Sequence, residues 1–201
     1  MIHLDGILLA AGESRRMGYP KPLLKIDGVS FIERIATSML AAVPRLVIVL
    51  GAHADRIRPA IPRDDRIAVV ENPNYSNGQL SSLKVGLAAV DPGAGGALVH
   101  LGDHPLVRVE SFRRLLEAYR GWSQPIVIAR CDGRRGHPLA FSRALFPELL
   151  DAPEHEGARY VVNRDPARVL YVDLDDPGIN LDLDTPADLQ RAGLPPPPAS
   201  R

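Results

Sequence analysis

The sequence has little that would suit a disulfide scaffold, a nucleic-acid-binding surface or a membrane span. Cys131 is the only cysteine among 201 residues, so neither an internal disulfide nor a cysteine-based metal site can form. The 24 lysines and arginines balance the 24 aspartates and glutamates, which removes any general attraction to nucleic acid or to an anionic membrane. No apolar stretch approaches the ~20 residues that cross a bilayer, and the N-terminus lacks the pattern of a signal peptide. These absences predict a cytoplasmic protein that binds neither nucleic acid nor membrane.

Short apolar runs alternate along the chain with stretches of helical periodicity. We expect strands at residues 6–10, 46–50, 67–70, 97–101 and 126–129. Uninterrupted runs of Val, Ile and Leu are typical of strands buried on both faces of a parallel sheet. The alternation predicts an α/β fold with a mostly parallel twisted sheet, helices on both faces, and ligands at the carboxyl ends of the strands.

The residues after position 130 continue the same domain. An Asp-Gly turn at 132–133, a helical stretch near 144–150 and a strand candidate at 169–173 follow one another without a linker-like block. Four consecutive prolines at 195–198 cannot continue a helix. We therefore predict one domain over residues 1–193 and a disordered, proline-rich tail over 194–201.

A glycine-rich segment with concentrated positive charge follows the first expected strand. It runs from Leu9 to Lys21 with the sequence LAAGESRRMGYPK. Small residues let backbone N–H groups approach phosphate oxygens, and basic side chains can neutralise them. The segment has neither the Gly-x-Gly-x-x-Gly of dinucleotide-binding proteins nor the Gly-Lys-Ser/Thr ending of a P-loop. We interpret it as a cradle for a polyphosphate rather than a plain solvated loop, and a hydride-transfer enzyme is disfavoured.

An acidic residue lies at the end of the fourth expected strand. Asp103 follows Gly102 and stands two positions before Pro105. A carboxylate at the carboxyl end of a buried strand is placed to hold Mg²⁺ against phosphate oxygens. The alternative is a helix N-cap for the segment that follows. We predict that Asp103 is a metal ligand.

A second acidic segment spans residues 180–189. Its alternation of leucine and aspartate predicts a strand in which Asp182 and Asp184 share one face while the leucines pack inward. Thr185 is then the expected N-cap of a helix, with Asp188 in a structural role in its first turn. We predict that Asp182 binds the metal together with Asp103. Whether Asp182 or Asp184 is the closer ligand stays open.

Five motifs along the chain carry a family resemblance. In order they are LAAGxSxRMGxxK ending at Lys21, NPxYxxG ending at Gly78, LGDxP ending at Pro105, RGHP ending at Pro138 and DLDTPxDL ending at Leu189. Their order and spacing resemble the MobA-like nucleotidyltransferase family over nearly the whole chain. The Ala-Ala-Gly, the RGHP and a Gly-Ala-Arg segment resemble the molybdenum cofactor cytidylyltransferases within that family.

The resemblance implies a three-layer α/β/α Rossmann-like nucleotidyltransferase fold, a nucleoside triphosphate substrate, Mg²⁺ and release of pyrophosphate. It implies Arg16, Lys21 and Asp103 as catalytic residues, with Asp103 and Asp182 as metal ligands. By motif position the nucleotide-binding residues are Leu9, Ala10, Ala11, Gly12, Glu13, Ser14, Arg16, Met17, Gly18, Lys21, Asn72, Gly78, Ser81, Ser82 and Gly102. The acceptor-binding residues are His104, Gly136, His137, Pro138 and Arg159. Without the resemblance, Asn72 would be a plain turn residue, and Ser81 and Ser82 a capped helix start.

The same resemblance implies CTP as the nucleotide and molybdopterin, or its molybdenum-bearing form, as the acceptor, with a molybdoenzyme or its chaperone as a further partner. Two alternatives stay open. One is a nucleotidyltransferase for a sugar phosphate or another small phosphorylated metabolite. The other is a non-catalytic accessory protein that binds a nucleotide or molybdopterin and hands it on. His104 and the Tyr19-Pro20 pair depart from the residues usual in the family, and both departures bear on the acceptor.

Overall fold

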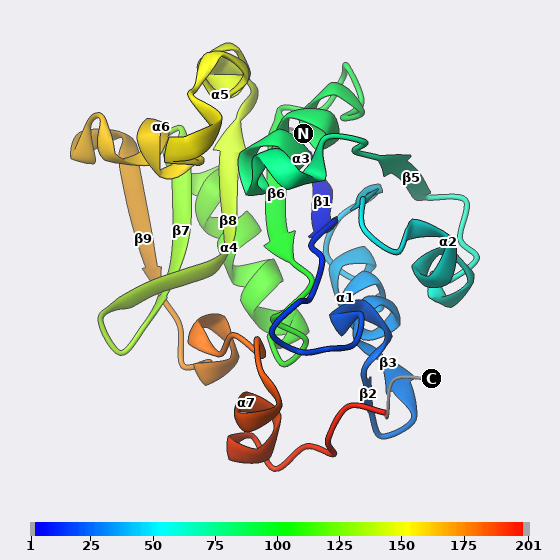
Figure 1. The fold of residues 1–201 in the computed structure, drawn as a ribbon. Coiled ribbons are helices and arrows are strands. Elements are labelled where there is room, and N and C mark those ends of the chain that lie inside the picture. Colours follow the sequence, from blue (N-terminus) through cyan, green and yellow to red (C-terminus); the bar gives the residue numbers. More distant parts are fainter. Residues whose placement is uncertain (1–2, 199–201) are drawn as a thin grey trace.

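A seven-stranded sheet organises residues 3–198, the part of the chain that the computed structural model describes (Figure 1). The strands lie in the order β5-β4-β1-β6-β8-β7-β9, and all neighbours are parallel except that β8 runs antiparallel to β6 and β7. Their bounds are β1 Leu4–Ala10, β4 Leu46–Leu50, β5 Ile67–Glu71, β6 Gly96–Leu101, β7 Ile126–Cys131, β8 Arg134–Ser142 and β9 Val169–Asp173. The five strands expected first, the strand candidate at 169–173, which is β9, and the mostly parallel α/β sheet are confirmed.

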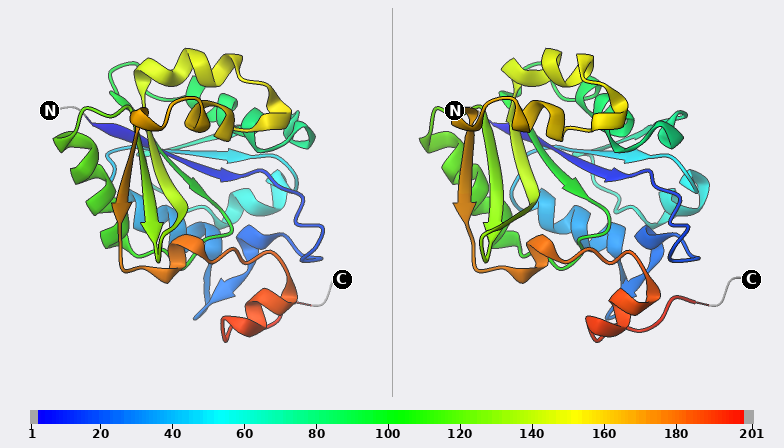
Figure 2. Two further views of the ribbon diagram at one scale, coloured as in Figure 1. Left: turned by 90° about the vertical axis from the view of Figure 1, so that its left-hand side faces the viewer. Right: turned by 60° about the vertical axis from the view of Figure 1, so that its left-hand side comes forward.

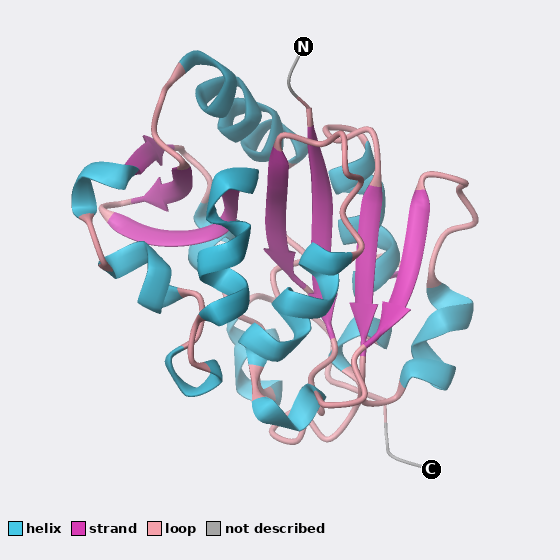
Figure 3. Cartoon of the chain, turned by 90° about the horizontal axis from the view of Figure 1, so that it is seen from above, coloured by secondary structure: helices cyan, strands magenta, loops and turns pink. Residues whose placement is uncertain are grey.

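Helices cover both faces of this sheet, which gives three layers (Figures 2 and 3). Helices α1 (Phe31–Leu40) and α4 (Val109–Gly121) pack on one face. Helices α3 (Gln79–Ala88), α5 (Phe146–Asp151) and α6 (Arg159–Asn163) pack on the other. The remaining elements are α2 (Ala54–Ile57), α7 (Pro186–Arg191), the hairpin of β2 (Lys25–Ile26) and β3 (Val29–Ser30), and 3-10 turns at Lys21–Leu23, Arg58–Ala60, Tyr75–Asn77, Arg143–Leu145, Glu154–Glu156, Pro166–Arg168 and Pro177–Asn180. Within residues 3–198, no helix has the length and apolar character needed to cross a membrane.

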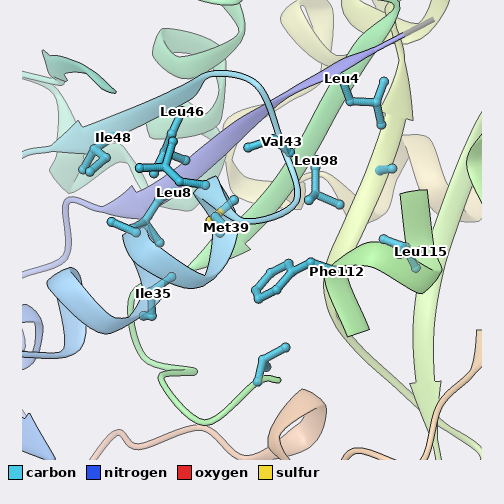
Figure 4. Packing of buried hydrophobic residues seen from close by; sticks show 14 of the residues in the cluster. Leu4, Leu8, Ile35, Met39, Val43, Leu46, Ile48, Leu98, Phe112 and Leu115 are labelled. Atoms are coloured by element: carbon cyan, nitrogen blue, oxygen red, sulfur yellow. The ribbon is translucent and has the colours of Figure 1, made fainter. Parts of the chain in front are cut away.

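The two faces of β1 show why most of its residues are apolar. Leu4 and Leu8 point into the cluster with α1 and α4, where Met39 and Phe112 meet them (Figure 4). Ile7 and Leu9 point into the opposite cluster with α3. Because successive side chains of a strand alternate between faces, a polar residue in a strand covered on both sides needs a buried partner, as Asp5 finds in Arg45 and the Asp91 amide. The ends of the strands are therefore where polar chemistry can lie.

The acidic segment at residues 180–184 is not a strand, so that prediction is wrong. A 3-10 turn at Pro177–Asn180 leads into irregular backbone, and α7 follows. The expected inward direction of the leucines is nevertheless correct: Leu183 is fully buried, and Leu181 packs against the same small cluster, which includes Met17 and Phe31. The segment has no neighbouring strand to pair with, because it crosses beneath the end of the sheet (Figure 1). Contacts of Leu181 and Leu183 with the small apolar cluster hold the segment in place instead.

The C-terminal residues close this small cluster. Leu194 packs against it, and its amide donates to the carbonyl of Leu189 at 2.8 Å. Thr185 and Asp188 form the reciprocal N-terminal cap of α7, which confirms the structural role expected for Asp188. The predicted tail falls partly outside the described residues, which end at position 198.

A buried carboxylate anchors the C-terminal segment to α4. Asp176 accepts hydrogen bonds from the Ser111 hydroxyl at 2.6 Å and from the amides of Arg108 and Gly178 at 2.9 and 3.1 Å. Gly178 itself leaves no room for a side chain, since a Cβ there would lie 2.6 Å from the carbonyl oxygen of Leu106. This contact fixes the start of the segment that carries Asp182.

We expect Asp176→Ala to lower the free energy of unfolding by about 2–4 kcal/mol, because it leaves a buried hydroxyl and amides without an acceptor. Urea denaturation followed by circular dichroism measures this loss. The neighbouring Asp175 is exposed, and Asp175→Ala serves as the matched control with little expected change. Equal stability of the two variants would contradict the anchoring role.

Candidate functional site

The candidate site lies at the carboxyl ends of β1 and β6, where the fold predicts a ligand. A cavity of about 240 Å³ opens there between the loop after β1, the start of α3 and the end of β6. Its walls include nine residues predicted to bind the nucleotide: Leu9, Ala10, Ala11, Gly12, Ser14, Lys21, Gly78, Ser82 and Gly102. Asp103 lines it as well.

The loop after β1 is shaped by Ser14. This residue has a positive φ of 54°, and its carbonyl accepts from the amides of Met17 and Gly18 at 3.0 and 3.1 Å. Its hydroxyl accepts from the Lys21 amide at 3.0 Å. Met17 is buried against the small apolar cluster and pins the far side of the loop. The turn leaves Gly12 exposed with open space around its Cα, so a ligand can approach the backbone closely.

Lys21 lies between two carboxylates from distant parts of the chain. Its Nζ is 2.8 Å from Asp103 Oδ2 and 2.6 Å from Asp184 Oδ1. Burial disfavours the ammonium, but the charges and hydrogen bonds of both aspartates outweigh burial and hold the pKa of Lys21 above its ordinary value. Arg16 reaches the other oxygen of Asp184 at 2.7 Å. The structure thus brings the predicted residues Arg16, Lys21 and Asp103 together around Asp184.

Asp103 has one carboxylate oxygen available for a ligand. Oδ2 accepts from Lys21, whereas Oδ1 is buried and has no hydrogen-bond partner among the described residues. Asp103 is not an N-cap, since α4 begins at Val109 and the amide before it bonds to Asp176. A buried carboxylate oxygen without a donor suits a hard cation. Asp103 Oδ1 therefore fits the divalent metal of the sequence analysis.

The second predicted metal ligand lies beside His104. Asp182 Oδ1 is 2.9 Å from His104 Nε2, and the same nitrogen is 3.7 Å from Asp103 Oδ1. Burial of His104 favours the neutral ring, but its contacts with Asp182 and Asp103 prevail and raise its pKa. The hydrogen bond from His104 in turn lowers the pKa of Asp182. Within residues 3–198 no three His, Cys, Asp or Glu side chains form a metal site, so a cation there would need ligands from substrate and water.

His104 belongs to a cluster of three rings beneath the site, which the sequence analysis missed. Its ring centroid is 5.9 Å from that of His100 and 5.5 Å from that of His137. Burial, followed by the nearby charge of His104, lowers the pKa of His137 to about 4 and that of His100 well below its usual value. Both rings are therefore neutral at pH 7, and His104 is the ring of the three whose pKa is raised. No sequence spacing points to this cluster, because β8 supplies one member and the end of β6 the other two.

A larger cavity of about 640 Å³ adjoins the first one, and Gly78, Gln79 and Leu101 line both. It is lined by four of the five predicted acceptor residues: His104, Gly136, His137 and Arg159. Pro138 is buried and does not line it. Gly136 permits a close approach of β8 to the C-terminal segment, because a Cβ there would lie 2.3 Å from the carbonyl oxygen of Ile179. The shared wall makes the two cavities direct neighbours.

Some predicted residues support the cradle without lining it. The buried Asn72 donates to the hydroxyls of Ser81 and Ser82 at 2.8 and 3.0 Å, and its own oxygen accepts from the Asn74 amide. These bonds join the end of β5 to the start of α3. Glu13, Arg16, Met17 and Gly18 also lie outside the smaller cavity's wall, and Glu13 pairs with Arg15.

The sequence analysis overlooked several lining residues. Tyr75, Gln79 and Pro22 line the smaller cavity, and Arg134, Arg135, Glu154 and Asn180 line the larger one. Tyr75 stands inside the NPxYxxG motif, and Arg135 begins RGHP, so both had a signal in their motifs. Glu154 and Asn180 had none, because tertiary packing alone brings them to the cavity.

Comparison with known proteins defines the class. Residues 6–169 match the model of the MobA-like NTP transferase domain, and the chain belongs to this family of nucleotidyltransferases. The fold agrees: the crystal structure of Rv0371c from Mycobacterium tuberculosis H37Rv superposes with a TM-score of 0.81 at 33% identity, over 95% of this chain and 97% of that one. That protein has also been crystallised as a manganese complex, with a TM-score of 0.75 and 32% identity.

Two characterised relatives have different names. A nicotine blue oxidoreductase of Paenarthrobacter nicotinovorans is 33% identical over 94% of this chain and 95% of its own length. The molybdenum cofactor cytidylyltransferase of Escherichia coli K12 is 27% identical over 94% of each chain. The family is thus shared by relatives whose substrates differ.

The depressed pKa of His137 predicts an acid-sensitive fold. An unfolded histidine titrates near pH 6.5 and His137 at about 4, so the unfolded state binds more protons between these values and stability falls as the pH falls. We expect His137→Gln to reduce the loss of unfolding free energy between pH 7 and pH 5 by about 1–2 kcal/mol. Urea denaturation at both pH values measures it. The exposed His155 provides the control variant His155→Gln, and identical pH dependence in His137→Gln and wild type would contradict the assignment.

Proposed function

We propose that this protein transfers a nucleotide from a nucleoside triphosphate to a phosphorylated acceptor and releases pyrophosphate. The observation that supports the proposal is that Lys21 and Asp103 contact each other in the wall of the smaller cavity, which shares Gly78, Gln79 and Leu101 with the larger one. The smaller cavity would hold the triphosphate against the glycine-rich loop, and the larger one the acceptor.

The chain supplies positions and charges for this reaction. An oxygen of the acceptor's phosphate attacks the α-phosphorus in line, a P–O bond to the α-phosphate forms, and the bond to the β-phosphate breaks. Lys21 and Arg16 neutralise the charge that grows on pyrophosphate. A phosphate monoester is already ionised at neutral pH, so the site needs no general base. The roles of the nucleotide-binding and acceptor-binding residues are part of this proposal.

Asp103 and Asp182 would hold the divalent metal, which we propose to be Mg²⁺. When bound, it would neutralise the phosphate oxygens between which the reaction takes place. Asp103 offers Oδ1, which has no hydrogen-bond partner among the described residues, and Asp182 is 63% exposed and lines the larger cavity. A manganese complex of a relative supports a divalent cation at such a site.

We propose CTP as the nucleotide and molybdopterin, or its molybdenum-bearing form, as the acceptor. The Ala10-Ala11-Gly12 sequence and the similarity to a molybdenum cofactor cytidylyltransferase support both. A sugar phosphate or another small phosphorylated metabolite is the second candidate acceptor. The cradle would bind only the triphosphate of the nucleotide, which all such reactions have in common. One relative is named a nicotine blue oxidoreductase, so the fold and family alone do not select the acceptor.

Pyrophosphate release tests these alternatives. Purified protein with Mg²⁺ is offered CTP, GTP, ATP and UTP in turn, with and without molybdopterin. We expect release with CTP only when molybdopterin is present. Turnover with a sugar phosphate instead would keep the chemistry and replace the acceptor, whereas silence with every acceptor, combined with nucleotide binding, would favour an accessory role.

Asp103→Asn should retain the fold and lose activity. The amide cannot provide the anionic oxygen that the metal needs, so we expect kcat to fall on the order of 10²–10³-fold. Asp173→Asn is the control, since Asp173 lies on edge strand β9 and pairs with Arg130 away from the site. A kcat of Asp103→Asn within tenfold of the wild-type value would show that Asp103 does not take part in the reaction.

A further inference from the structure

Tyr75 is the one aromatic side chain among the described residues that line the smaller cavity. It is half-buried and begins the 3-10 turn Tyr75–Asn77, which lies between β5 and α3. We propose that the ring of Tyr75 packs against the base of the bound nucleotide. This inference rests on the proposed function, and it assigns a binding residue to the part of the nucleotide that the phosphate cradle does not hold.

The start of the Tyr75 side chain is fixed against the loop after β1. Gly51 directly follows β4, and a Cβ on Gly51 would lie 2.7 Å from the Tyr75 Cβ and 2.7 Å from the carbonyl oxygen of Ala11. The same carbonyl accepts a hydrogen bond from the Ala52 amide at 3.0 Å. Because Gly51 has no side chain, Tyr75 can come close to the backbone of the cradle.

Hydrogen bonds on both sides hold the turn that carries Tyr75. The carbonyl of the preceding Asn74 accepts from the Ser81 hydroxyl at 3.1 Å, and the Asn74 amide donates to the buried Asn72 at 2.9 Å. On the other side, the Gly78 amide donates to the Tyr75 carbonyl at 3.2 Å. Since the backbone is already ordered, little conformational entropy is lost when a ligand packs against this turn.

The charged and uncharged groups of the smaller cavity come from different elements. Its charged lining residues are Lys21 and Asp103, from the loops after β1 and β6. Tyr75, Gln79 and Ser82 carry no charge and come from the 3-10 turn and the start of α3. A triphosphate needs the charged groups, so the base of the same nucleotide is left with the uncharged wall. A tyrosine ring in that wall offers a flat apolar face to the base.

A contact between the ring and the base has a recognisable effect on binding. Loss of an aromatic ring that stacks on a base weakens binding about 5- to 30-fold. Every base has a flat face, so such a contact strengthens binding without choosing between the four nucleotides. Inorganic tripolyphosphate has no base, and its binding should therefore not depend on the ring of Tyr75.

The test is Tyr75→Leu, measured by calorimetric titration with CTP and with inorganic tripolyphosphate, both in the presence of Mg²⁺. We expect the Kd for CTP to rise about 5- to 30-fold, and the Kd for tripolyphosphate to stay within about twofold of the wild-type value. Retained binding of tripolyphosphate also shows that the variant is folded. Equal weakening for both ligands would make Tyr75 a structural support of the cradle and overturn the proposal, as would unchanged binding of CTP.

Two further variants serve as controls. Tyr75→Phe keeps the ring and should bind CTP with a Kd within about twofold of the wild-type value. A Kd as high as that of Tyr75→Leu would assign the contact to the hydroxyl and refute stacking. Tyr171→Leu removes a ring from edge strand β9, outside the walls of both cavities, and should leave both Kd values unchanged.

Failure of the proposed function would look different. If wild-type protein binds none of CTP, GTP, ATP and UTP, the proposed function fails and this inference fails with it. If wild type binds and turns over CTP, but Tyr75→Leu binds CTP as tightly as wild type does, the function stands and the inference alone is refuted.

Discussion

The ion pairs of Lys21 are the interaction on which the candidate site depends. One ammonium joins the loop after β1, the end of β6 and the C-terminal segment, which are separated by 82 and 163 positions in the sequence. Each of these segments has its own anchor: Ser14 for the loop, the sheet for Asp103, and Asp176 with the small apolar cluster for the C-terminal segment. Lys21 is mostly buried, so water solvates its ammonium poorly. Loss of either Asp103 or Asp184 would therefore weaken the stabilisation of this charge.

The sheet explains why such a charged group can exist in this fold. Its central strands are mostly apolar on both faces, and the helices of the two outer layers cover them. Polar chemistry is left to the carboxyl edge, where the loops after β1 and β6 meet at neighbouring strands. Relatives with different names are similar to this chain over nearly its whole length, which is expected when one scaffold serves several functions.

Much of this architecture could be predicted from local sequence. Uninterrupted apolar runs predicted five of the strands, and the Thr-Pro-x-Asp pattern predicted the start of α7, because both depend on near neighbours. The strand expected at 180–184 was wrong, since alternation alone does not supply a pairing partner. Sequence reasoning could not predict the contact of Asp184 with Lys21, nor the cluster of His100, His104 and His137. Both arise only when β8 and the C-terminal segment pack beside β6. Asn72 had a motif signal, yet only packing shows that its amide is engaged by serine hydroxyls.

The account's central claim is that one cradle positions both the triphosphate and the metal ion. A crystal structure of the protein with Mn²⁺ and a non-hydrolysable CTP analogue tests it most directly. The account predicts the triphosphate against Gly12 and Lys21, with the anomalous signal of manganese at coordination distance from Asp103 Oδ1. A nucleotide bound elsewhere, or an Asp103 Oδ1 without a metal ion beside the bound triphosphate, would contradict it.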